Sequence, residues 1–164
     1  MEFIQGDILD KELIQKYCHD ADIVHHLAGV TDVPRTKSES DNSKDKKIKE
    51  VGEQGTQNIL NAISKRCKII FPSTHVVYEG INEVKTDIKE DETLKPVLSY
   101  STSKAINEEQ LKKSGKNYII LRLGSVYGYS TDSMRIDIMP NLFSKIASQN
   151  GTCLLYTSPS PRDH

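Results

Sequence analysis

The 164-residue chain lacks the features that mark a membrane protein, a secreted protein or a nucleic-acid-binding protein. It has no apolar run long enough to cross a bilayer and no signal-peptide pattern after Met1. An excess of one charge is also lacking. The 22 basic residues face 23 acidic ones, which gives no electrostatic reason to bind nucleic acid or an anionic membrane. We therefore expect a cytoplasmic protein with neither membrane nor nucleic acid among its partners.

Cysteine is scarce and scattered. The three cysteines, Cys18, Cys67 and Cys153, are odd in number and form no Cys-x-x-Cys pair. This pattern predicts isolated thiols rather than disulfides or metal ligands. His25 and His26 are neighbours but have no third ligand at metal spacing, so we expect no bound metal.

The chain does contain a regular alternation of expected strands and helices. Short apolar runs predict strands at residues 2–5, 21–29, 68–71 and 117–123. Apolar residues at helical spacing, with capping residues beside them, predict helices after residue 10, ending near 64, over 100–113 and over 136–148. We interpret this pattern, which has no internal repeat, as an α/β fold: a Rossmann-like, doubly wound parallel sheet.

Two details of the expected strands can be tested directly. The run at 21–29 is almost entirely apolar, which predicts a parallel strand buried on both faces. Pro72 follows the run at 68–71, and because proline has no N–H to donate, we expect it to end that strand.

The stretch from Ser99 to Lys104 carries the candidate chemistry. Tyr100 and Lys104 lie four residues apart, so they share one face of the expected helix. An ammonium close to a phenol favours the phenolate, and we therefore expect the pKa of Tyr100 to fall from about 10 toward neutrality. A tyrosine of this kind can take a proton from a substrate hydroxyl or return one to a carbonyl. Thr74, expected at a strand end, can donate to the same oxygen.

Six short motifs, in order, resemble the extended short-chain dehydrogenase/reductase superfamily, in its NAD-dependent epimerase/dehydratase branch. The match covers nearly all of residues 2–150. The motifs are Gly6-Asp7-Ile8, His26-Leu27-Ala28-Gly29, Gly55-Thr56-x-Asn58-Ile59-Leu60, Ser73-Thr74-x-x-Val77-Tyr78, Tyr100-x-x-x-Lys104 and Arg122-x-x-Ser125-Val126-Tyr127-Gly128.

The resemblance implies roles for these residues. Tyr100 would be the acid/base, Lys104 would lower its pKa and hold the nicotinamide ribose, and Thr74 would orient the substrate hydroxyl. The implied cofactor is NAD, with NADP as the alternative, and hydride chemistry belongs to that cofactor. The residues implied to bind it are Asp7, Ile8, Leu27, Ala28, Gly29, Ser73, Tyr100, Lys104, Leu123, Ser125 and Val126.

The function implied by the resemblance is an NAD(P)-dependent nucleotide-sugar epimerase that forms a homodimer when complete. One alternative is a keto-sugar reductase of the same superfamily, which shares all of these motifs. The other, from a different class, is a non-catalytic cofactor-binding scaffold. An intact set of Thr74, Tyr100 and Lys104 argues against the scaffold, because a sensor has no need for a tuned phenol.

The sequence departs from the family pattern at several places. The Gly-rich phosphate loop of the family is absent from this sequence, because the chain begins at what resembles the family's third strand. Gly52 and Ser125 stand where the family usually has asparagine, and His75-Val76 stands where sugar 4,6-dehydratases carry Asp-Glu, which disfavours dehydration. Residues 153–164 resemble a translated sequencing adaptor. We therefore expect a partial NAD(P)-binding domain over 1–152, inactive by itself.

Overall fold

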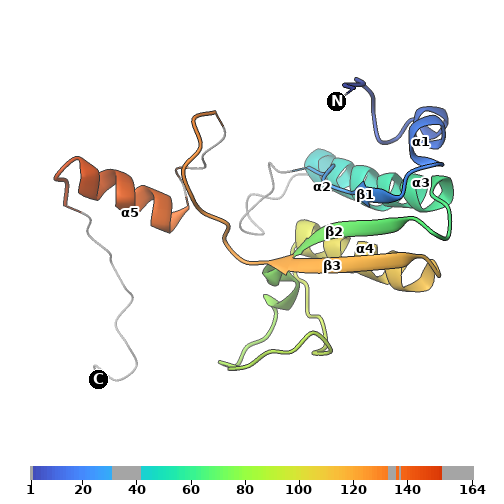
Figure 1. Cartoon of the computed structure of the whole chain (residues 1–164). Coiled ribbons are helices and arrows are strands. Elements are labelled where there is room, and N and C mark those ends of the chain that lie inside the picture. The colour runs from blue at the N-terminus through green and yellow to red at the C-terminus, as the bar shows by residue number, and fades with distance from the viewer. Residues whose placement is uncertain (1, 31–41, 133–135, 137, 153–164) are drawn as a thin grey trace. The chain divides into compact units, whose positions relative to one another are not determined.

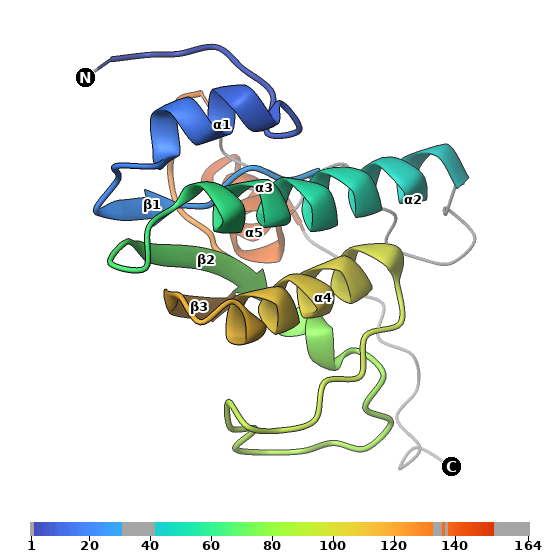
Figure 2. The ribbon, with the colours of Figure 1, turned by 90° about the vertical axis from the view of Figure 1, so that its right-hand side faces the viewer.

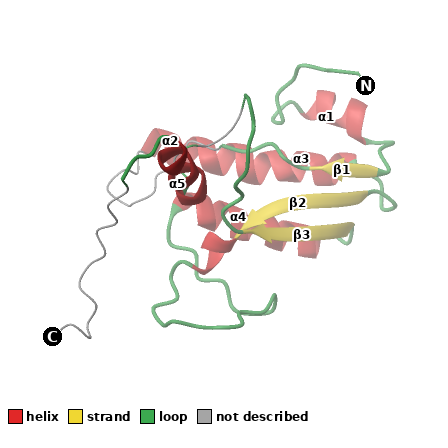
Figure 3. Cartoon of the chain, turned by 60° about the vertical axis from the view of Figure 1, so that its left-hand side comes forward, coloured by secondary structure: helices red, strands yellow, loops and turns green. Residues whose placement is uncertain are grey.

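The computed structural model describes residues 2–30, 42–132, 136 and 138–152. The chain divides into two units, residues 1–124 and 125–164. The first unit holds a sheet with its helices, and the second holds helix α5 (Met139–Ser148) (Figure 1). Helices, strands and loops are distinguished in Figure 3. The expected domain limits, 1–152, stay a prediction, and the adaptor-like tail and Cys153 lie outside the described residues.

The sheet consists of three parallel strands in the order β1-β2-β3. These strands are β1 (Ile23–His25), β2 (Lys68–Thr74) and β3 (Asn117–Leu123). Both crossover connections are helical. The first contains α2 (Asn42–Lys49), a π-helical turn (Glu50–Gln54) and α3 (Gly55–Ala62), and the second contains a 3-10 turn (His75–Tyr78) and α4 (Ser99–Lys113). The expected Rossmann-like α/β fold with a parallel sheet is confirmed.

Local sequence signals explain two of the helix ends. The side chain of Asp10 accepts a hydrogen bond from the backbone N–H of Leu13 (3.0 Å) and begins α1 (Lys11–Cys18), as expected of an N-cap residue. After α4, Gly115 has a φ of +66°, the left-handed conformation that lets glycine end a helix.

The hydrophobic core lies between one face of the sheet and helices α3 and α4 (Figure 2). Ile69 and Phe71 of β2 point into it and meet Ile59 of α3, Ile63 just after α3 and Leu111 of α4. Cys67 and the half-buried Cys18 also pack there, and both are free thiols, as the sequence predicted.

The opposite face of the sheet is much more exposed. Along β3, the alternate residues Ile119, Leu121 and Leu123 share one face and are 40%, 42% and 40% exposed. Ile23 of β1 is 54% exposed, so the prediction that this strand is buried on both faces is wrong. The sequence run was apolar enough for two covered faces, but the described elements cover only one.

The strand expected at residues 2–5 is not formed. Residues 2–6 are exposed and pair with none of the described strands. A strand forms only when a neighbour accepts its hydrogen bonds, and no local pattern in the sequence can supply that neighbour.

Candidate active site

The carboxyl ends of the three strands lie at the same edge of the sheet, because the strands are parallel. Thr74 is the last residue of β2 and lies opposite Leu123, the last residue of β3, while β1 ends at His25. The hydroxyl of Thr74 accepts a hydrogen bond from the N–H of Val76 (3.3 Å). Its own proton stays available to donate to a substrate oxygen at this edge.

The sequence suggested that Pro72 ends β2, but the strand continues beyond it. Pro72 instead lies where the sheet narrows from three paired strands to two. The ladder with β3 continues through Pro72 to Thr74. The ladder with β1 stops earlier, where the N–H of His26 donates to the carbonyl of Ile70. Pro72 lies two residues further on, so its carbonyl faces the side where β1 has ended. There it accepts a hydrogen bond from the ammonium of Lys104 (2.8 Å).

This hydrogen bond decides how the ammonium and Tyr100 are arranged. The Lys104 nitrogen lies 4.5 Å from the centre of the Phe71 ring and 5.9 Å from the centre of the Tyr100 ring. Burial lowers the pKa of Lys104 to about 8. Because the ammonium is directed at the Pro72 carbonyl, it does not dominate the phenol, and burial raises the pKa of Tyr100 above its ordinary value. The expected fall in the pKa of Tyr100 is therefore wrong for this structure.

His26 lies next to this group and is almost fully buried. Its Nε2 is 2.8 Å from the hydroxyl of Thr56, its ring centre is 5.3 Å from that of Phe71, and its Nδ1 is buried without a partner. Burial, together with the charge of Lys104, lowers the pKa of His26 to about 4. His26 is therefore a neutral packing residue at neutral pH. In the described part of the chain, no group of three or more His, Cys, Asp or Glu side chains could hold a metal ion.

A second tether between β2 and α4 is made by Glu108, one turn beyond Lys104. Its carboxylate is fully buried and accepts a hydrogen bond from the hydroxyl of Ser73 (2.6 Å). Arg122 of β3 donates to the same carboxylate through Nε (3.0 and 3.2 Å) and Nη2 (2.7 Å). Burial alone would raise the pKa of Glu108, but hydrogen bonds from Arg122 and Ser73 lower it. The carboxylate thus stays charged.

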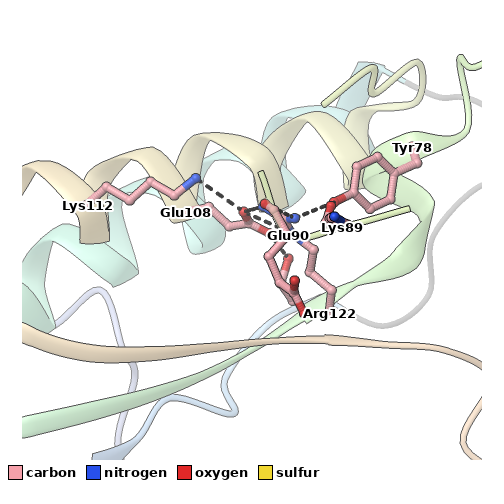
Figure 4. Close-up of polar contacts among 7 residues, drawn as sticks. Tyr78, Lys89, Glu90, Glu108, Lys112 and Arg122 are labelled. Atoms are coloured by element: carbon pink, nitrogen blue, oxygen red, sulfur yellow. Dashed lines mark hydrogen bonds and ion pairs between the residues drawn. The ribbon is translucent and has the colours of Figure 1, made fainter. Parts of the chain in front are cut away.

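Arg122 extends this network to the connection between β2 and α4 (Figure 4). Its Nη1 donates to the hydroxyl of Tyr78 and to the carbonyl of Glu90 (2.8 Å). The hydroxyl of Tyr78 in turn donates to the carbonyl of Lys89 (3.3 Å). One guanidinium therefore fixes strand β3, helix α4 and the long connection relative to one another.

The other residues of the first unit that were predicted to bind the cofactor differ in their exposure. Leu27, Ala28 and Gly29 follow β1 and are exposed, and a Cβ built on Gly29 would meet no atom within 4 Å. Asp7 is exposed and accepts from the N–H of Leu9 (2.9 Å). The side chain of Ile8, in contrast, packs on the core and against Gly55. Ser125 and Val126 belong to the second unit and stay predictions.

The structure shows what surrounds Gly52 and His75, two of the residues at which the sequence departs from the family pattern. Gly52 lies in the π-helical turn and faces α4: a Cβ built on it would lie 2.3 Å from the hydroxyl oxygen of Ser103, and its carbonyl accepts from Asn107 (3.1 Å). The Nδ1 of His75 lies 3.1 Å from the carbonyl of Leu123 and therefore donates to it. His75 is therefore hydrogen-bonded to the end of β3.

Sequence reasoning missed Glu108 and the pairing of Arg122 with it. Two signals were present. Glu108 lies four residues after Lys104, so it shares the helix face that carries Tyr100 and Lys104. Arg122 is the one charged residue in the otherwise apolar second half of β3, where a buried guanidinium requires a partner.

These features define a class: a Rossmann-type α/β protein in which a Tyr-x-x-x-Lys helix is tethered to a strand end that carries a hydroxyl. Residues 1–164 match the model of the NAD dependent epimerase/dehydratase family. The chain belongs to this family.

Named relatives agree with this assignment. A Methanocaldococcus jannaschii protein named "Putative UDP-glucose 4-epimerase" is 32% identical over 139 residues, 80% of this chain and 43% of that protein. UDP-glucose 4-epimerase from Brucella ovis, solved with NAD, is 26% identical with a TM-score of 0.64, over 85% of this chain and 43% of that one. The NAD⁺ complex of WbmH from Bordetella bronchiseptica shares the fold, with 24% identity and a TM-score of 0.69 over 92% of this chain and 48% of that one.

The chain thus spans less than half the length of these relatives. The structural neighbours include complexes with NAD and with NADPH. None of the helices in the described residues is long and apolar enough to span a membrane.

Proposed function

We propose that this chain carries the catalytic strand end and helix of an NAD(P)-dependent nucleotide-sugar epimerase. The observation that carries the proposal is the pair of tethers between β2 and α4. Lys104 donates to the carbonyl of Pro72, and Ser73 donates to Glu108. Thr74, the next residue of β2, is thereby held against the helix that bears Tyr100.

The proposed chemistry divides the proton transfer among three side chains. Thr74 donates a hydrogen bond to the reacting hydroxyl of the sugar, and Tyr100 takes the proton from that hydroxyl and later returns it. Lys104, whose pKa of about 8 leaves it mostly protonated at pH 7, stabilises the phenolate that forms. Two of its three N–H groups remain for this, since one is used on Pro72. A bound nicotinamide supplies the acceptor and donor of hydride.

The exposure of the residues after β1 is compatible with a bound cofactor. Leu27 is 72% exposed and the backbone at Gly29 is open, so a ligand can approach the main chain closely there. The edge is also where open α/β sheets bind nucleotides. We propose that NAD or NADP contacts the residues of the first unit that the resemblance assigned to it, except Ile8, which packs on the core. A nucleotide-sugar substrate, a homodimer and a cytoplasmic location remain parts of the same proposal.

The test is product analysis with the full-length protein, UDP-glucose as the probe and NAD present. An epimerase interconverts two sugars without net change in the cofactor, whereas net reduction of NAD in step with the loss of UDP-glucose would identify a dehydrogenase and overturn the proposal. We expect Tyr100→Phe to lower turnover by about 10²–10⁴-fold, the usual contribution of a general acid/base. The matched control is Tyr118→Phe, a tyrosine of β3 that is 38% exposed. Full turnover in Tyr100→Phe would contradict the catalytic role.

A further inference from the structure

The first turn of α4 carries Tyr100 and is not capped by the side chain of the residue that precedes it. The helix begins at Ser99, and the N-cap position is held by Leu98, which has no oxygen in its side chain. The first N–H groups of a helix have no partner within it. The earliest helical hydrogen bond here runs from the N–H of Thr102 to the carbonyl of Leu98 (2.9 Å). The hydroxyl of Ser101, in the third position of the helix, accepts hydrogen bonds from the N–H groups of Leu98 (3.2 Å) and Val97 (3.3 Å), and the remaining contacts at the start of the helix come from outside it.

Glu79 supplies those contacts from the other end of the connection. Its Oε1 accepts hydrogen bonds from the backbone N–H of Val97 (2.8 Å) and of Leu98 (2.7 Å), and from the hydroxyl of Ser101. A carboxylate at a helix N-terminus is also favoured by the helix dipole. Burial alone would raise the pKa of Glu79, but the hydrogen bonds from Ser101, Leu98 and Val97 lower it.

The backbone fixes Glu79 in this place. The N–H of Gly80 donates to the carbonyl of Lys95 (2.8 Å), and the N–H of Lys95 donates to the carbonyl of Val77 (2.9 Å). A Cβ built on Gly80 would lie 2.7 Å from the carbonyl oxygen of Lys95, so only glycine allows this approach. The two ends of the connection are closed against each other, with Glu79 directly beside the closure.

We propose that Glu79 is a positioning residue for Tyr100, acting by holding the first turn of α4. The inference rests on the proposed function, because it takes Tyr100 to be the acid/base. Lys104 lies in the next turn and has its own anchor on the carbonyl of Pro72. Loss of the Glu79 carboxylate therefore loosens Tyr100 relative to Lys104 while leaving Lys104 in place.

The experiment compares Glu79→Ala and Glu79→Gln in the full-length protein with NAD and UDP-glucose. We expect Glu79→Ala to lower kcat by about tenfold or more with KM little changed, since displacement of a catalytic group by about 1 Å costs up to about 10²-fold. Glu79→Gln keeps an acceptor oxygen for the two amides and should restore most of the lost kcat. Glu83→Ala, an exposed acid of the same connection, is the matched control.

Hydrogen exchange provides a readout that does not depend on turnover. We expect amides of residues 97–102 to exchange about tenfold faster in Glu79→Ala, while those of residues 108–113 keep their wild-type rates. Unchanged kcat and unchanged exchange in Glu79→Ala would overturn the inference. Equal acceleration along the whole helix would overturn it as well, because Glu79 would then support only the fold. If Tyr100→Phe retains turnover, the proposed function fails, and the exchange rates still decide whether Glu79 holds the turn.

Discussion

Lys104 and Glu108 lie one turn apart on α4, and the structure treats these two charged side chains in opposite ways. Glu108 meets a guanidinium and a hydroxyl, and its pKa is lowered, so its charge is secured. Lys104 meets a carbonyl oxygen and an aromatic ring, and its pKa is also lowered, which for an ammonium weakens the charge. The comparison indicates that Glu108 serves the fold, whereas we propose that Lys104 serves the chemistry.

The largest expected effect follows from removing the secured charge. Glu108→Ala leaves the guanidinium of Arg122, only 14% exposed, without its carboxylate. Breaking one side of a buried ion pair costs about 3–5 kcal/mol, and we expect a loss of this size in the free energy of unfolding, measured in urea. The control is Glu109→Ala, which removes an exposed pair with Lys113 and should cost far less, because solvent screens that pair. Equal losses in the two variants would show that Glu108 contributes no more to the stability of the fold than an exposed acid does.

Much of the fold around this pair was predictable from local patterns. Strand β3 has the expected bounds, 117–123, the helix after Asp10 has the expected cap, and the apolar residues Ile59, Leu60 and Ile63 are buried as their spacing indicated. These features depend on side-chain periodicity and on single capping hydrogen bonds, both of which are visible along a few residues.

The parts that were not predictable depend on partners distant in the sequence. The absence of a strand at residues 2–5 reflects a missing neighbour. The direction of the Lys104 ammonium, and with it the pKa of Tyr100, depends on where β1 ends beside Pro72. In the sequence, nothing distinguishes Glu79 from an ordinary surface acid. Only the closure of a connection of about twenty residues brings it to the start of α4.

A smaller effect on stability is expected from the protonation of His26. Its measurement tests whether this buried neighbour of Lys104 is kept neutral. Its pKa of about 4 in the folded protein lies below the ordinary value of about 6.5, so the unfolded chain binds a proton first as the pH falls. Stability due to neutral His26 is thus complete above pH 6.5 and is lost as the pH falls toward 4. We expect the unfolding free energy of the wild type, relative to His26→Gln, to fall by about 2 kcal/mol from pH 7.5 to pH 5. A difference between wild type and His26→Gln that does not vary with pH would show that His26 is not held neutral by its site.

The smallest effect on stability, and the sharpest form of the comparison, is expected from Lys104→Met. Methionine resembles the aliphatic part of the lysine side chain but removes the ammonium, and with it the cation–π contact with Phe71. The lost hydrogen bond to Pro72, worth about 1 kcal/mol, is offset because a buried charge no longer has to be desolvated. We expect the unfolding free energy at pH 7 to stay within about 1 kcal/mol of the wild type, while turnover in the full-length protein is lost.

The pH dependence of the same variant gives the sign of the Lys104 contribution. The folded protein releases the Lys104 proton near pH 8 and the unfolded chain near 10.5, so the unfolded state binds more protons between these values. The wild type should therefore gain stability relative to Lys104→Met as the pH rises from 8 to 10.5. If the variant instead loses several kcal/mol at pH 7, as expected for Glu108→Ala, both charges on α4 are anchors of the fold. A stable but inactive variant would mean that the ammonium is retained for the proton chemistry of Tyr100 at a cost in stability.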